Sequence, residues 1–165
     1  AKYGLAAALL HRADAADRVR GLGLMLQVRE IWLREPIPFL VPVADLWVAR
    51  DSARRGDRDA SITVMRKTVD ELHRAGRPFF ELLGISFMVE TLLERGADGD
   101  LTEAREAIES LAQLGAPEDW AMREVTLLRL RALVAKADGH HDAHLTWLAR
   151  YHEMAKTSGF EGHIA

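Results

Sequence analysis

The chain has 165 residues, of which 48% are hydrophobic and 28% are charged, and its formal net charge is −3. This balance excludes a disordered tail, and it provides no basic surface for a nucleic-acid backbone. The absence of cysteine excludes disulfides, thiolate metal sites and cysteine nucleophiles, and it fits a reducing compartment. No apolar run reaches the roughly 18 residues that span a bilayer, and no signal-peptide pattern opens the chain. We therefore expect a cytoplasmic protein with no nucleic-acid or membrane partner.

In chain order, the hydrophobic periodicity predicts four helix pairs, at residues 1–35, 39–76, 78–115 and 118–159. Pro36 and Pro38 enforce the first break, because proline cannot continue a helix without losing a hydrogen bond. No stretch has the alternation of a strand. The expected helices are residues 2–12, 15–35, 39–55, 59–75, 78–95, 101–114, 118–137 and 142–157.

Glycines mark the expected turns at a nearly fixed period. Those within pairs lie 43 and 40 residues apart, and those between pairs lie 39 and 44 apart. Such a period is typical of stacked helical pairs, because a single pair cannot bury its own apolar face. We predict an all-α fold, an α-solenoid of about four antiparallel helix pairs in one domain over residues 1–165. The turn glycines are Gly56, Gly99 and Gly139 within pairs, and Gly76, Gly115 and Gly159 between pairs.

The two helices of a pair differ in how their apolar residues are arranged. The second helices carry one apolar stripe each, such as Ile62, Met65, Val69 and Leu72, opposite a charged face. The longer first helices are apolar nearly all round, which predicts that they are covered on several sides or line a groove. Asp100 and Glu103 have the spacing of a capping box, and Asp142 is expected to cap the last helix.

Both ends of the chain look internal to a longer polypeptide. The sequence is helical in pattern from its first residues, and it stops as another helix would start. The polar capping repeats with which solenoids usually end are missing from the pattern. We therefore expect a fragment of a longer protein.

The third pair resembles a tetratricopeptide repeat. Leu83-Gly84 with Phe87 looks like the first-helix signature, and the turn and second helix match at Gly99-Asp100, Ala104, Ile108, Leu111 and Ala116-Pro117. The period of about 40 exceeds the usual 34, because the first helices are longer. Longer repeats of this kind resemble the helical regions of large bacterial signalling proteins. Examples are MalT-like regulators with a signal-transduction ATPase and actinobacterial proteins joining a nucleotide cyclase to an ATPase. The resemblance covers about residues 39–165, implies a sensor or interaction role and carries over no catalytic residue.

Four residues of the first helices are candidates for a binding groove: Asp45, Trp47, Glu90 and Arg129. A charge among apolar neighbours must pair with another charge, reach solvent or face a lined groove. Trp47 could anchor a partner peptide, or it could pack between repeats as a core residue.

The only local pattern that resembles a metal site is His140, Asp142 and His144. The two histidines lie four residues apart, but we expect a turn with solvated histidines and no metal, because the first histidine precedes the helix and the i, i+4 geometry is lost. Gly21 and Gly23 lack the strand and third glycine of a phosphate-binding loop, so they more simply allow a close helix approach. We expect no cofactor.

These patterns favour a non-catalytic protein-interaction or effector-sensing module of a larger regulator. Its partner would be a protein or peptide, or upstream domains of the same chain. The alternative is structural self-association into a homodimer through apolar ends at residues 5–10 and 160–164. A ligand-binding enzyme domain ranks third, because no catalytic constellation is visible.

Overall fold

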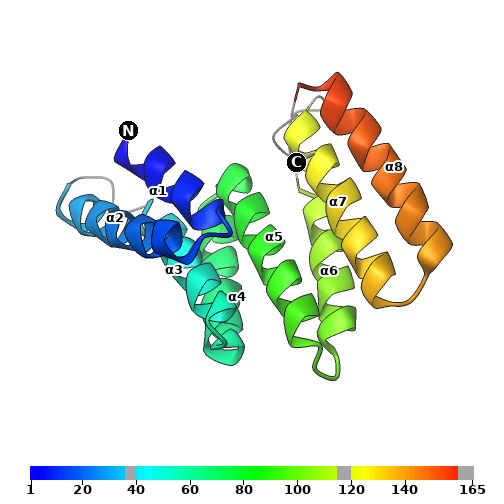
Figure 1. The fold of residues 1–165 in the computed structure, drawn as a ribbon, viewed down its shortest axis with the longest axis horizontal. Coiled ribbons are helices and arrows are strands. Elements are labelled where there is room, and N and C mark those ends of the chain that lie inside the picture. Colours follow the sequence, from blue (N-terminus) through cyan, green and yellow to red (C-terminus); the bar gives the residue numbers. More distant parts are fainter. Residues whose placement is uncertain (36–39, 115–119, 160–165) are drawn as a thin grey trace. The chain divides into compact units, whose positions relative to one another are not determined.

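The structure is a computed structural model that describes residues 1–35, 40–114 and 120–159 (Figure 1). Within these ranges the chain forms eight helices and no strand, which confirms the predicted all-α class. No helix end in these ranges differs from its predicted position by more than three residues. The predicted starts at residues 39 and 118, and the turn at Gly115, lie outside them. The helices are α1 (Lys2–His11), α2 (Ala15–Arg34), α3 (Val41–Arg54), α4 (Arg58–Arg74), α5 (Pro78–Arg95), α6 (Asp100–Ala112), α7 (Ala121–Ala137) and α8 (His141–Thr157).

The chain divides into two compact units, residues 1–80 and 81–165. In the first unit α2 packs against α1 and α3, and α3 packs against α4. In the second unit α7 packs against both α6 and α8. None of the helices in the described ranges is long and apolar enough to cross a membrane.

The contact between α1 and α2 depends on Gly21. A Cβ atom built on Gly21 would lie 2.9 Å from the Leu9 Cβ, 3.0 Å from the Leu10 nitrogen and 3.1 Å from the Ala6 carbonyl oxygen. Gly23, two residues later, faces open space. The predicted close approach of helices is therefore confirmed at Gly21 and does not involve Gly23.

The apolar stripes of the second helices are confirmed in α4 and α6. Ile62, Met65 and Leu72 are buried on α4, with Ala104, Ile108 and Leu111 on α6. The last helix differs, since only Tyr151 and Ala155 of α8 are fully buried, and Leu145 is exposed. The first helices α3, α5 and α7 bury residues on most of their circumference, as their composition predicts.

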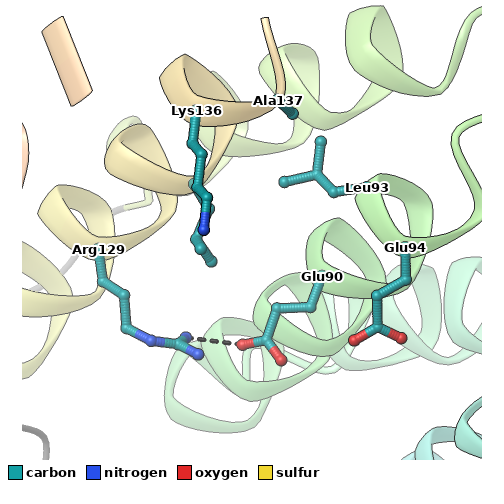
Figure 2. A pocket seen from close by; sticks show the side chains of 7 residues that line it. Glu90, Leu93, Glu94, Arg129, Lys136 and Ala137 are labelled. Atoms are coloured by element: carbon teal, nitrogen blue, oxygen red, sulfur yellow. Dashed lines mark ion pairs between the residues drawn. The ribbon is translucent and has the colours of Figure 1, made fainter. Parts of the chain in front are cut away.

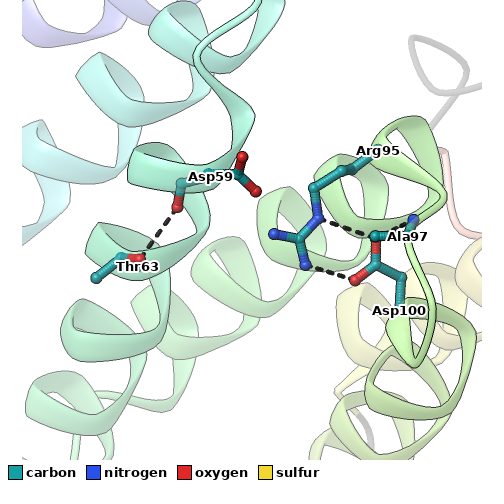
Figure 3. Close-up of polar contacts among 5 residues, drawn as sticks. All are labelled: Asp59, Thr63, Arg95, Ala97 and Asp100. Carbon is teal, nitrogen blue, oxygen red and sulfur yellow. Dashed lines mark hydrogen bonds and ion pairs between the residues drawn. The ribbon is translucent and has the colours of Figure 1, made fainter.

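The turn before α6 corrects the predicted capping box. Gly99, with a φ of 89°, is the N-cap, and Asp100 is the first residue of the helix. The buried Asp100 carboxylate accepts hydrogen bonds from the Ala97 amide at 2.8 Å and from the Arg95 Nε at 3.0 Å (Figure 3). The carboxylate therefore closes the turn against the end of α5. In the other unit, the Thr63 hydroxyl donates to the Asp59 carbonyl one turn earlier on α4, at 3.0 Å.

The two glycines of α2 form a matched pair for testing this packing. We expect Gly21→Ala to lower the free energy of unfolding by about 1–2 kcal/mol, because the new methyl group overpacks the contact with α1. Gly23→Ala should raise it by about 0.5–1 kcal/mol, since alanine favours a helix and meets no neighbour. Urea denaturation followed by far-UV circular dichroism measures both. Equal effects from the two substitutions would contradict the proposed contact.

Candidate functional site

An open pocket of about 510 Å³ lies between α5 and α7 in the second unit (Figure 2). Its α5 residues follow helical spacing, at positions i, i+3 and i+4, and its α7 residues follow positions i, i+4, i+7 and i+8. Each wall is therefore one face of one helix. The lining residues are Glu90, Leu93 and Glu94 from α5, and Arg129, Leu133, Lys136 and Ala137 from α7.

An ion pair joins the two walls of the pocket. The Arg129 Nη1 lies 2.6 Å from the Glu90 Oε1, and the side chains are 38% and 16% exposed. From the sequence, each of these charges could pair with another charge, reach solvent or face a groove. In the structure, Glu90 and Arg129 pair with each other. Because both groups retain contact with water, a pair of this kind contributes about 0–1 kcal/mol to stability. Its main effect is to hold two oppositely charged groups at one side of the pocket.

The other two charged residues of the pocket follow the same pattern, with the acid on α5 and the base on α7. Glu94 extends the acidic wall by one turn of α5, and Lys136 extends the basic wall by two turns of α7. Figure 2 shows Lys136 reaching from α7 toward the middle of the pocket. Among the described residues, Lys136 has no ion-pair partner. Leu93 and Leu133 supply apolar surface between the charges. The pocket can therefore hold a ligand by apolar contact and orient it by charge.

Sequence reasoning did not single out Glu94, Lys136 or the two leucines. A signal for them exists, because Glu94 lies four residues after Glu90 and Lys136 seven after Arg129. Residues at these spacings share a helix face. Which face α5 and α7 turn toward each other is decided by packing, so the spacing alone could not identify the pocket.

The other two predicted groove residues lie in the first unit. Asp45 accepts a hydrogen bond from the Arg29 Nε at 2.6 Å, and this bond raises the pKa of the Arg29 guanidinium above its ordinary value. Trp47 is 4% exposed and donates from its Nε1 to the Tyr3 hydroxyl at 3.2 Å. Burial raises the pKa of that Tyr3 phenol. Trp47 thus packs in the core of its unit, and Asp45 ties α3 to α2.

The two histidines of the metal candidates have separate partners. The His140 Nδ1 lies 2.7 Å from the Asp138 Oδ2, and the His144 Nδ1 lies 2.9 Å from the Ala132 carbonyl oxygen. His140 is the N-cap residue of α8, so the prediction that Asp142 caps this helix is wrong; Asp142 lies inside its first turn. Across the described ranges, no group of three or more metal-ligating side chains comes together.

Sequence reasoning also missed the acid that organises this turn. Asp138 follows α7 and accepts a charged hydrogen bond from Arg105 of α6 as well as the contact from His140. The bond from Arg105 is the main cause that lowers the pKa of the Asp138 carboxyl, with His140 adding to it. No sequence signal connects Arg105 to Asp138, because they are 33 residues apart on different helices.

Comparisons of the chain with protein-family models, with curated proteins and with solved structures find no match. Function is therefore inferred from the geometry of the site itself. That geometry joins apolar surface to two acidic and two basic side chains, which is suited to recognition of a ligand that carries charge.

The lowered pKa of Asp138 predicts a pH-dependent contribution to stability. The folded state favours the ionised carboxylate more than the unfolded chain does, so this contribution is present above the ordinary Asp pKa of about 4. It is lost as the pH falls through the lowered folded-state value. We expect Asp138→Asn to be less stable than the parent at neutral pH, and the difference to shrink toward about pH 3.

Urea denaturation at a series of pH values measures this difference. Asp98→Asn is the matched control, because Asp98 is an exposed acid in a turn of the same unit and forms no ion pair with any described residue. A difference between Asp138→Asn and the parent that stays constant with pH would contradict the assignment.

Proposed function

We propose that this chain is a non-catalytic protein-interaction or effector-sensing module that binds a peptide segment in the α5/α7 pocket. The observation that carries the proposal is the pairing of an acidic wall, Glu90 and Glu94, with a basic wall, Arg129 and Lys136. The segment would belong to a partner protein or to upstream domains of the same polypeptide. A charged small-molecule effector is the alternative ligand for the same pocket.

The size and lining of the pocket support a ligand of this class. A volume of about 510 Å³ falls within the range of small-molecule and side-chain sites. A few peptide side chains would fill it, with an apolar residue against Leu93 and Leu133. A basic side chain of the ligand would meet Glu94, and an acidic one would meet Lys136. Opposite charges placed in this way orient a peptide and exclude others of the wrong charge pattern.

The ion pair between Glu90 and Arg129 offers a route from binding to a conformational response. A ligand acid would compete for Arg129, and a ligand base would compete for Glu90. Either would change the link between α5 and α7. A response in upstream domains follows only if the ligand has different affinities for two arrangements of the helices.

We also propose the repeat architecture and the kind of protein in which this pocket acts. The glycine-bounded helix pairs and the tetratricopeptide-like third pair support an α-solenoid of antiparallel pairs, in which first helices line the binding surface. A cytoplasmic regulator of the bacterial signalling type is the setting that this resemblance implies.

Selection from a displayed random-peptide library tests the pocket directly. We expect the 165-residue protein to enrich peptides that contain both acidic and basic residues around an apolar one. Lys136→Glu should weaken the binding of these peptides about tenfold, because it replaces attraction by repulsion at the basic wall. Fluorescence anisotropy with the enriched peptides measures the Kd.

Arg20→Glu supplies the matched control, since Arg20 is an exposed arginine of α2 that forms no ion pair with any described residue. This control should leave the Kd within about twofold of the parent value. Selection that enriches no peptide, or peptides that bind Lys136→Glu as tightly as the parent, would refute the proposed function.

Self-association is a second candidate function, and α2 favours it. Val19, Leu26 and Leu33 lie seven residues apart, so they form one line along the helix, and they are between 44% and 73% exposed. A seven-residue apolar repeat is the spacing at which two helices pack along their length. The apolar end proposed from the sequence is smaller than expected, because Leu9 and Leu10 are buried. Residues 160–164 lie outside the described ranges.

Light scattering over a hundredfold concentration range distinguishes the two functions. Self-association through α2 predicts a dimer mass for the parent and a monomer mass for Leu26→Glu, because a charge in the centre of the line cannot be buried unpaired. Val64→Glu changes a similarly exposed residue of α4 and should leave the dimer intact. A parent protein that is monomeric throughout would exclude this second function.

A further inference from the structure

Two arginines stack on one tryptophan at the contact between α7 and α8. The guanidinium carbon of Arg131 lies 5.4 Å from the ring centroid of Trp147, and that of Arg150 lies 5.0 Å from it. Trp147 is half-buried and packs against the cluster of Val125, Leu128, Tyr151 and Ala155. The indole is therefore held in place by the core, and it holds the two guanidinium groups beside it.

Neither arginine has a carboxylate partner among the described residues. Two acids lie seven residues from Arg131 in the sequence, and both are engaged with other cations. Glu124 pairs with Arg123 at 3.1 Å, and Asp138 is held by Arg105 and His140. Glu153 follows Arg150 by three residues on α8 and forms no ion pair with it in the described part of the chain. Most other arginines of known placement do bind a carboxylate or a carbonyl, so two cations with no such partner within the described ranges require their own explanation.

The stack lies on a different face of α7 from the pocket. Arg131 is two residues after Arg129 and two before Leu133, which both line the pocket. At about 100° per residue, two positions rotate a side chain by about 200°, to the opposite side of the helix. A ligand bound at the stack would therefore not occupy the α5/α7 pocket.

Stacking prepares a guanidinium group to bind an anion. A guanidinium group that lies over an aromatic ring carries its five N–H donors along the edge of its plane, where an anion can accept from them. The side chain has already lost much of its rotational freedom, so less entropy is lost when a ligand binds. A carboxylate accepts two parallel hydrogen bonds from such an edge, and charge strengthens both.

We infer that Arg131, Trp147 and Arg150 form a docking site for an acidic peptide segment that presents two carboxylates. The two guanidinium carbons lie at most about 10 Å apart, because both are near the same ring centroid. Acidic side chains four residues apart on a helix have Cβ atoms about 5–6 Å from each other and flexible ends. One carboxylate therefore reaches each arginine. The exposed position of Arg150 leaves the site open to such a segment.

Fluorescence anisotropy tests the site with a labelled peptide that carries two glutamates four residues apart. We expect the parent protein to bind it, with an affinity that falls as salt is added. A peptide with glutamines in place of the glutamates should bind about tenfold more weakly. Arg131→Gln with Arg150→Gln should reduce the affinity for the glutamate peptide by tenfold or more. Arg150→Gln alone, which changes only an exposed side chain, should reduce it about threefold to tenfold.

Three controls make the result specific. Arg20→Gln removes the same charge from α2, and Lys136→Gln removes it from the pocket; both should leave the affinity within about twofold. Far-UV circular dichroism checks that every variant is folded. Equal loss in Arg20→Gln and Arg150→Gln would overturn the proposal, because it would show attraction to net charge alone. Loss in Lys136→Gln would also overturn it by placing the acidic peptide in the α5/α7 pocket. Binding of a phosphoserine peptide but not the glutamate peptide would overturn it in favour of phosphate recognition.

Discussion

Burial of the first helices is the constraint on which the second unit depends. Because α5 and α7 cover most of their circumference with apolar contacts, few positions on them can carry a charge. A charge at such a position must find a partner or keep contact with water. Glu90 and Arg129 do both, since they pair across the two helices and each retains some exposure. The pocket is the opening beside this pair. Its acidic and basic walls follow from the few positions at which α5 and α7 can carry a charged side chain.

One helix, α7, supplies two surfaces of different chemistry. Arg129 and Lys136 face α5, where acidic side chains oppose them. Arg131 faces the contact with α8, where an indole rather than a carboxylate meets it. The rotation of the helix separates the two surfaces, although Arg129 and Arg131 are only two residues apart in the sequence. A ligand at one surface would therefore not displace a ligand at the other.

The turn chemistry shows where local rules succeed and where they fail. The turn glycines that lie in the described ranges all have positive φ, because only glycine adopts that backbone region without strain. The expected caps at Asp100 and Asp142 are wrong for a related reason. In each case the helix begins earlier than the apolar pattern does, so the carboxylate lies inside the first turn. The Asp100 carboxylate instead accepts hydrogen bonds from Arg95 and Ala97, and these depend on how the end of α5 lies against the turn.

The sequence by itself determined the helices and the glycine turns between them. These are local properties, because periodicity and glycine backbone freedom act within one or two turns. Both Gly21 and Gly23 were predicted to allow a close approach of helices, and only packing selected Gly21. Only the tertiary structure decided which charges meet. Glu90 pairs with Arg129 and Asp138 with Arg105, while Trp47 is buried and Trp147 carries two arginines. Such contacts depend on the rotation of each helix about its own axis. A single residue of register turns a side chain by about 100°, and only packing against the neighbouring helices selects that rotation.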